Sequence, residues 1–212
     1  LISLDLKQEA LQLGLLLLQG RPLDIPLIHM IGQLLEKLGN LPGAIHYAHT
    51  AVMLEPENPQ WHRWMAQLWE LKGDWEKALQ EWNKVLELSK QPTVEDLAAY
   101  MRCALKVNQP QRAMERGAEI LEREPSHGQV NALMGQALAQ SGELQEAIPY
   151  LSRATLLMPE EPESWLLLAE VYRRLGESQK RLETLRSAIQ SLPEIPAVVV
   201  ALADACLAIG SL

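Results

Sequence analysis

The sequence has only two cysteines in 212 residues, Cys103 and Cys206, and they lie far apart. Neither belongs to a CxxC pair or to a cluster of cysteine and histidine, so a disulfide framework and a structural zinc site are not expected. We therefore expect both cysteines to be small side chains of the core.

Long hydrophobic runs are also missing. The longest are residues 13–18, which Gly14 interrupts, and residues 197–203, which Asp204 closes. A membrane-spanning helix needs about 20 apolar residues in succession, so we expect no membrane span. The chain begins at Leu1 without the basic and apolar segments of a signal peptide. We expect a cytoplasmic location but leave it open, because a segment upstream of Leu1 would change it.

Basic residues are in the minority, with 19 Lys and Arg against 27 Asp and Glu, and the formal net charge is −8. Proteins that bind nucleic acid present positive charge to the phosphate backbone, so nucleic acid is not an expected partner. Apolar residues make up 48% of the chain, which is typical of a folded protein and too many for a disordered one.

Catalytic motifs are absent as well, because the sequence contains no Gly-rich phosphate loop, no HExxH and no GxSxG. His46 and His49 have a spacing that could place both on one helix face toward a metal. No third ligand is apparent, so we interpret them as ordinary surface histidines. We predict no enzymatic activity, no cofactor and no metal site.

The sequence does contain a repeat of about 34 residues. A proline cannot continue a helix and tends to lie just beyond a helix end. Six prolines follow apolar helical patterns such as AVMLEP and ATLLMP, at separations of 34, 36, 33, 34 and 34 residues. A period of this length indicates a helical repeat. These prolines are Pro22, Pro56, Pro92, Pro125, Pro159 and Pro193.

A glycine or asparagine recurs between these prolines, and we number each repeat so that this residue is position 15. Gly and Asn are suited to the left-handed conformation in which many helices end. Each unit is therefore predicted to be a helix of about a dozen residues, a tight turn and a second, antiparallel helix. The residues at position 15 are Gly39, Gly73, Asn108, Gly142, Gly176 and Gly210.

Positions 8 and 20 are mostly small, which predicts that two helices approach each other closely there. Met101 at position 8 and Arg181 at position 20 are the exceptions. Positions 4, 7, 8 and 11 form the predicted buried stripe of each first helix. Position 8 holds Gly32, Ala66, Met101, Gly135, Ala169 and Ala203, and position 20 holds Ala44, Ala78, Ala113, Ala147 and Arg181.

These features resemble the tetratricopeptide repeat, whose pattern is W-x2-L-G-x2-Y, then A-x3-F, then P. The closest copies are WLLLAEVY (165–172), AIPYLSRATLLMP (147–159) and ALQEWNKVLEL (78–88). The resemblance implies an all-α fold, a right-handed α-solenoid of stacked antiparallel helix pairs. We expect one solenoid domain over residues 1–212.

The expected domain contains five full repeats and two half repeats. Val198 to Gly210 lacks the polar outer face that a terminal repeat usually carries. We therefore expect the chain to be a segment of a longer array or protein, or to pair with another copy at its ends. The full repeats are 25–58, 59–93, 94–127, 128–161 and 162–195, preceded by a second helix in 1–24 and followed by a first helix in 196–212.

The resemblance also implies a binding surface on the concave side, lined by the first helices, with positions 2, 5, 9, 12 and 13 facing the groove. A column of glutamines would hydrogen-bond to an extended peptide backbone of any sequence. Arg63 and Arg102 would contact an acidic residue or a C-terminal carboxylate, and Ala98 would leave room for an apolar side chain. The alternative is that these are solvated polar positions. The predicted peptide-binding residues are Gln33, Arg63, Gln67, Arg102, Ala132, Gln136, Leu166 and Arg174.

One unit is crowded with tryptophan. Trp69 and Trp82 occupy core positions, whereas an aromatic patch at Trp61, Trp64 and Trp75 would suit a protein partner. Packing within and between repeats is the favoured interpretation.

Three functions are consistent with this pattern. The leading one is a non-enzymatic scaffold that binds a protein segment or extended peptide in its groove. The second is a regulatory or substrate-recruiting segment of a larger multidomain enzyme or regulator, which the full-length open reading frame would reveal. The third is self-association through the open ends, which predicts a mass in light scattering that depends on concentration, and this dependence is abolished by Leu16→Glu or Val199→Glu.

Overall fold

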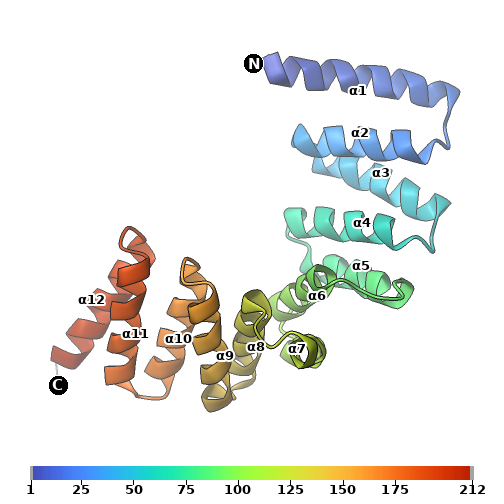
Figure 1. Cartoon of the computed structure of the whole chain (residues 1–212). Helices are drawn as coiled ribbons and strands as arrows, with labels where there is room; N and C mark the ends of the chain where they lie inside the picture. The colour runs from blue at the N-terminus through green and yellow to red at the C-terminus, as the bar shows by residue number, and fades with distance from the viewer. Residues whose placement is uncertain (1, 211–212) are drawn as a thin grey trace. The chain divides into compact units, whose positions relative to one another are not determined.

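The computed structural model describes residues 2–210, and in this range it consists of twelve α-helices joined by short turns, with no strand (Figure 1). The predicted all-α solenoid of antiparallel helix pairs is confirmed. None of the described helices is long and apolar enough to cross a membrane. The helices are α1 (Ile2–Gly20), α2 (Ile25–Lys37), α3 (Leu41–Leu54), α4 (Pro59–Lys72), α5 (Trp75–Leu88), α6 (Val94–Lys106), α7 (Pro110–Arg123), α8 (Gly128–Ser141), α9 (Leu144–Leu157), α10 (Pro162–Arg174), α11 (Ser178–Ser191) and α12 (Pro196–Gly210).

The chain divides into two compact units, unit 1 (Leu1–Cys103) and unit 2 (Ala104–Leu212), and the boundary falls within α6. In unit 1, α1 packs on α2, and the pairs α2–α3 and α4–α5 are stacked on each other. In unit 2, α7 packs on α8, the pairs α8–α9 and α10–α11 are stacked on each other, and α12 packs on α11. The repeat boundaries drawn from the sequence remain predictions.

The turns inside the repeats have the conformation that their residues predict. Asn108, with φ of 57°, is a non-glycine residue in the left-handed region, which asparagine tolerates better than most side chains. Asn40, in the turn between α2 and α3, accepts a hydrogen bond from the backbone N–H of Gly43 at 3.0 Å, and Asp24, which precedes α2, caps that helix in the same way at 3.1 Å. The position-15 glycines with positive φ are Gly39, Gly73, Gly142 and Gly176.

The turns between repeats are tied by a recurring side-chain bond. A nitrogen-bearing side chain at position 4 contacts the carbonyl oxygen of the proline six residues earlier, which closes the link between one second helix and the next first helix. Three different residue types make this contact: His62 to Pro56 at 2.9 Å, Asn131 to Pro125 at 3.0 Å and Trp165 to Pro159 at 3.0 Å.

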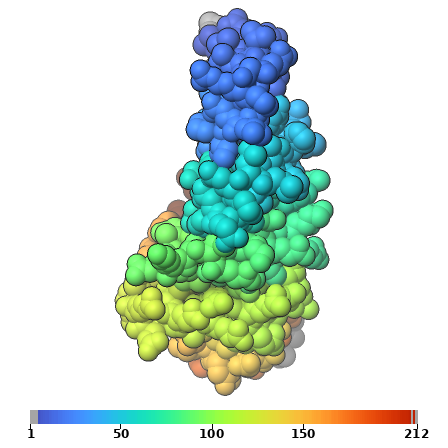
Figure 2. Space-filling model, turned by 90° about the vertical axis from the view of Figure 1, so that its right-hand side faces the viewer, coloured from blue at the N-terminus to red at the C-terminus, as the bar shows by residue number. Residues whose placement is uncertain are grey.

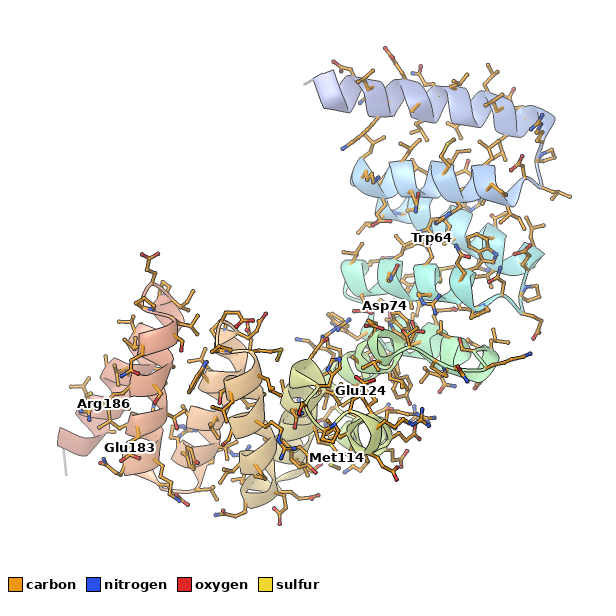
Figure 3. All side chains as sticks on the ribbon, viewed as in Figure 1. Trp64, Asp74, Met114, Glu124, Glu183 and Arg186 are labelled. Atoms are coloured by element: carbon orange, nitrogen blue, oxygen red, sulfur yellow. The ribbon has the colours of Figure 1, made fainter. Side chains whose placement is uncertain are left out.

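The small residues at positions 8 and 20 lie where the helices are closest. The alanines at position 20, such as Ala44 and Ala147, have no exposed surface. A Cβ atom on Gly135 would lie 2.5 Å from Leu151, which belongs to the second helix of the same repeat. A Cβ on Gly32 would lie 2.3 Å from the Trp64 ring, which belongs to the next repeat (Figure 3). A small residue at position 8 therefore leaves space for a large side chain of the neighbouring repeat as well as for the second helix of its own repeat.

The tryptophans are mainly core residues. Trp61, Trp64 and Trp82 are buried, and Trp69 and Trp75 are half-buried, so a surface patch at Trp61 and Trp64 is not formed. The bulk of Trp61 and Trp64 is accommodated because the preceding repeat offers Gly32 beside the Trp64 ring and alanines of α3 in the same cluster.

The two cysteines differ in environment. Cys103 is buried, as expected. The expectation for Cys206 is wrong, because Cys206 is exposed on the face of α12 that packs against no other described helix.

We predict that Gly32→Ala destabilises the protein by about 1–3 kcal/mol, because the added methyl group must displace the Trp64 ring in a packed core. Thermal unfolding followed by circular dichroism measures the loss. Gly20→Ala is the matched control, since a Cβ there meets no atom within 4 Å. An equal effect of the two substitutions would contradict the proposed packing constraint.

Candidate functional site

The first helices of unit 1 expose one continuous stripe. In α2 the exposed residues lie at positions 2, 6, 9 and 13, and in α4 they lie at positions 2, 9 and 13, apart from Lys72 at the end of that helix. These positions fall on one side of a helix with 3.6 residues per turn. We call the stripe the first-helix surface of unit 1. It contains Pro26, Met30, Gln33, Lys37, Gln60, Gln67 and Leu71.

Position 5, expected to face the groove, instead connects neighbouring first helices. His29 of α2 packs edge-on against Trp61 and Trp64 of α4, with ring centroids 5.2 and 4.7 Å apart. Burial lowers the pKa of His29 despite the nearby Glu36 carboxylate. The neutral imidazole is thereby favoured, and His29 acts as a packing residue. Ala98, which was expected to leave room for a ligand, is buried.

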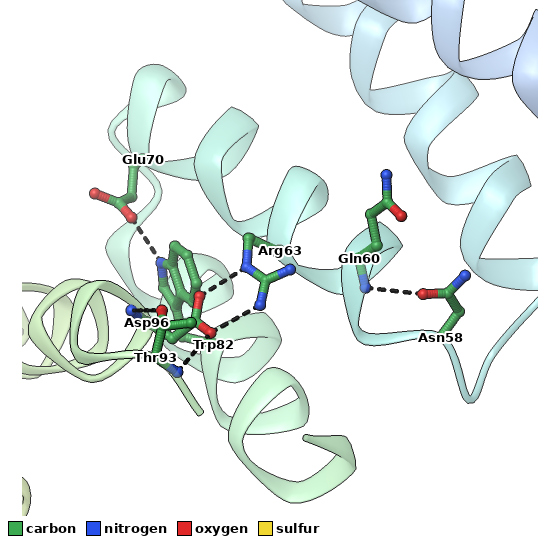
Figure 4. Close-up of polar contacts among 7 residues, drawn as sticks. All are labelled: Asn58, Gln60, Arg63, Glu70, Trp82, Thr93 and Asp96. Atoms are coloured by element: carbon green, nitrogen blue, oxygen red, sulfur yellow. Dashed lines mark hydrogen bonds and ion pairs between the residues drawn. The ribbon is translucent and has the colours of Figure 1, made fainter. Parts of the chain in front are cut away.

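Arg63, also at position 5, binds a carboxylate of the next first helix. Its Nε and Nη2 atoms each donate to one oxygen of Asp96 at 2.7 Å (Figure 4). The Asp96 side chain is only 3% exposed and also accepts from the backbone N–H of Thr93 at 3.3 Å. Burial alone would raise the pKa of Asp96, but the hydrogen bonds and charge of Arg63, with those from Thr93, lower it. Asp96 is therefore an ionised partner of Arg63.

A second arginine repeats this link between α4 and α6. Arg102 donates to Glu70 at 3.2 Å, and the other oxygen of Glu70 accepts from the Trp82 indole of α5 at 2.6 Å. Glu70 thus joins a second helix to the next first helix. Figure 4 shows its bond to Trp82. Arg63 and Arg102, predicted to meet a carboxylate of a ligand, already meet carboxylates of their own chain.

Cys103 lies beside this network but is not a candidate nucleophile. Burial, followed by the negative charge of Glu70, raises the pKa of its thiol to about 12. The thiolate is the reactive form of cysteine, so Cys103 is unreactive at neutral pH.

In unit 2 the predicted residues are less exposed. Ala132, Gln136 and Leu166 are half-buried, and Leu166 packs against the clusters that contain Val198 and Ala205. Arg174 is exposed and donates to the backbone oxygen of Ala139 in the preceding first helix, at 2.9 Å. Its role parallels that of Arg102, because both arginines reach back to position 12 of the preceding first helix.

The histidine pair lies on the second-helix side of unit 1. His46 and His49 line a shallow pocket with Trp69, Lys77 and Glu81. Among the described residues, no group of three His, Cys, Asp or Glu side chains is placed to hold a metal ion.

Sequence-family models support the repeat interpretation. Three models described as tetratricopeptide repeat match residues 29–92, 104–171 and 162–193. None of the curated proteins matches the sequence.

Solved structures share the fold at low sequence identity. YrrB, described as a TPR protein with an unusual peptide-binding site, is 18% identical, with a TM-score of 0.70 over 89% of this chain and 96% of that one. MamA from Desulfovibrio magneticus RS-1 is 20% identical, with a TM-score of 0.73 over 81% and 97% of the two chains. A thermophilic TPR protein from Thermus thermophilus is 19% identical, with a TM-score of 0.63 over 86% and 99%.

We predict that Asp96→Asn costs about 1–3 kcal/mol of stability at pH 7, because it removes the charged acceptor of Arg63. The pKa of Asp96 in the folded chain lies below its ordinary 3.8. The contribution is therefore complete above about pH 5 and is lost as the pH falls through the folded pKa. Denaturant unfolding of both proteins between pH 3 and 7 tests this.

Glu87→Gln is the control for that series, because Glu87 pairs with Lys84 where both side chains are about half exposed, and such pairs contribute little. An effect of Asp96→Asn that is as large at the lowest pH as at pH 7 would contradict the ion-pair assignment.

We also predict that, at low protein concentration, one thiol per native chain reacts with a colorimetric thiol reagent at pH 7–8, and two react after denaturation. Cys206 is exposed, whereas Cys103 is buried. Cys206→Ser should abolish the native reaction. Rapid reaction of both thiols in the native protein would show that the packing around Cys103 opens.

Proposed function

Because the chain belongs to the tetratricopeptide repeat family, we propose that it is a non-enzymatic protein-interaction scaffold whose first-helix surface binds an extended segment of a partner protein. One observation carries the proposal. Gln33 and Gln67 occupy the same position of successive first helices, and both are exposed.

The chemistry of glutamine suits this role. Each side-chain amide offers two donors and one acceptor oxygen, which match the N–H and C=O groups that an extended backbone presents at regular intervals. Neither Gln33 nor Gln67 is required for the links between repeats described above. Met30 and Leu71 are 40% and 60% exposed on the same surface, which supplies apolar contacts for side chains of the partner.

In this proposal Arg63 and Arg102 stabilise the scaffold and do not bind the partner directly. Arg63 is held by Asp96 and Arg102 by Glu70, so they fix the first helices relative to each other within unit 1. A partner carboxylate would have to compete with these internal acceptors. Recognition is therefore expected to rely on the backbone and the apolar side chains of the partner segment.

In unit 2, Ala132, Gln136, Leu166 and Arg174 remain proposed contacts. Gln136 continues the position of Gln33 and Gln67, although it is half-buried. The description of YrrB as carrying a peptide-binding site supports the view that this fold can present such a surface.

The test begins with selection of linear peptides from a random display library on the purified chain. The affinity of the best synthetic peptide is then measured by fluorescence polarisation. We predict that Gln33→Ala combined with Gln67→Ala weakens binding about tenfold to 100-fold, since each lost hydrogen bond contributes about 0.5–1.5 kcal/mol. The melting temperature should stay the same, because both side chains are exposed.

The matched control changes two exposed glutamines of second helices in the same unit, Gln19→Ala with Gln80→Ala. This variant should bind like the parent. Equal affinity of all three proteins, or failure to select any peptide, would count against the first-helix surface as the binding site.

A further inference from the structure

One of the links between successive repeats contains a titratable side chain. His62, in the first turn of α4, has Nε2 at 2.9 Å from the carbonyl oxygen of Pro56 and Nδ1 at 2.7 Å from Oε2 of Glu81 on α5. The side chain of His62 is 9% exposed, and that of Glu81 is 26% exposed. Helices α3 and α5 both pack on α4, and Figure 2 shows this part of unit 1 in light blue to green. His62 therefore connects the turn after α3 with α5.

The two acceptors around His62 determine where its ring hydrogens lie. A carbonyl oxygen can only accept, so the Nε2 atom that faces Pro56 carries a hydrogen. The Nδ1–Oε2 distance of 2.7 Å to Glu81 is typical of a charge-assisted hydrogen bond. A carboxylate is a weaker base than an imidazole, so the hydrogen between these two atoms belongs to Nδ1. Because a neutral imidazole has a single N–H, only the imidazolium donates to both acceptors.

The equivalent links in unit 2 do not titrate. Asn131 donates through Nδ2 to the carbonyl oxygen of Pro125 at 3.0 Å. Trp165 donates through Nε1 to the carbonyl oxygen of Pro159, also at 3.0 Å. Neither an amide nor an indole changes its charge near neutral pH. Of these three links, only the one at His62 depends on a bound proton.

Carboxylates on the turn before α4 favour the charged form of the imidazole. Glu55 and Glu57 flank Pro56 in the sequence. The side chains of Trp61 and Asn58 donate hydrogen bonds to Glu55 and lower the pKa of its carboxyl, so Glu55 is ionised at neutral pH. Negative charge next to an imidazole stabilises its protonated form.

The cations on the surrounding helices have other partners, so the Glu81 carboxylate is left to His62. On the α3 side, His46 and His49 are exposed and line a shallow pocket with Glu81. On α2, burial lowers the pKa of His29, which favours its neutral form. The partners of the cations are Asp74 for Lys77, Glu87 for Lys84, Asp96 for Arg63 and the Trp69 ring for Lys72.

We propose that Pro56, His62 and Glu81 form a proton-dependent link that stabilises the junction of α3, α4 and α5. With His62 protonated, the link makes both hydrogen bonds. When the pH rises and the ring loses its proton, His62 can donate to only one acceptor, and the other contact becomes a close approach of two lone pairs. The link is therefore complete under acidic conditions and is weakened under alkaline ones. This proposal concerns the stability of the scaffold and does not depend on where a partner binds.

The first test compares denaturant unfolding of the full chain with that of two variants, from about pH 6 to about pH 8.5. His62→Asn is the matched control, because Asn131 shows that an asparagine at this position donates to the proline carbonyl without titrating. Glu81→Gln replaces the carboxylate by an amide whose NH₂ group can donate to Nδ1, so the neutral ring keeps both bonds. Circular dichroism gives the unfolding equilibrium constant of each protein at each pH.

We expect the unfolding constant of the parent, relative to that of His62→Asn, to rise about threefold to tenfold over this range, as expected for the loss of one hydrogen bond. The sign follows because the folded chain makes its second bond only when it binds this proton, so a rise in pH favours the unfolded chain. Glu81→Gln should lose this dependence or reverse its sign. The other titrating groups, including His29, are shared with His62→Asn and cancel in the ratio.

A second measurement examines the parent itself and does not require a variant to fold. Long-range ¹H–¹⁵N NMR spectra, with the histidines assigned, report which ring nitrogens carry a hydrogen. At pH 7 we expect a hydrogen on both ring nitrogens of His62. In Glu81→Gln the same ring should carry a hydrogen on Nε2 alone.

Three results would overturn the proposal. The first is a His62 ring in the parent that carries a single hydrogen at pH 7. The second is a parent whose stability changes with pH in the same way as that of His62→Asn. The third is a Glu81→Gln variant that keeps the pH dependence of the parent.

Discussion

The close approach of neighbouring helices is the constraint on which the rest of this structure depends. A pair of helices of this length buries too little apolar surface to be stable alone, so each repeat must dock on the next. Close approach requires a small residue where backbones or bulky side chains meet. Gly32 provides it between repeats, under the Trp64 ring, and Gly135 provides it within a repeat, under Leu151. The left-handed turns then hold each helix pair antiparallel, so that these small residues face their partners.

The same docking determines which residues are free for function. Positions 5 and 12 are drawn into contacts between successive first helices, through His29 with Trp64, Arg63 with Asp96 and Arg102 with Glu70. In α2 and α4, positions 2, 9 and 13 remain exposed. The polar and charged side chains of the first helices therefore have two separate roles: the ion pairs stabilise the stack, and the amides of the exposed stripe are available to a partner.

Helices α1 and α12 follow the same repeat register, but each has one face that no other described helix covers. Leu17, at position 27, and Ala203, at position 8, are core residues by their place in the repeat, yet both are exposed because no other described helix covers them. The apolar content of α1 and α12 is thus explained by the repeat register. Cys206 is also at a core position, position 11, and it is exposed for the same reason.

By itself, the sequence determined the helix pairs, the turns and the buried stripe, because these depend on local properties: the period of apolar residues, the left-handed preference of Gly and Asn, and the inability of proline to continue a helix. It also placed Gln33 and Gln67 on an open face. Only the tertiary structure decided that Arg63 and Arg102 are bound by Asp96 and Glu70, that Ala98 is buried and that Trp64 fills the space left by Gly32. Those contacts join residues about 30 positions apart, and their partners depend on how far each side chain reaches across the helix interface, which periodicity does not encode.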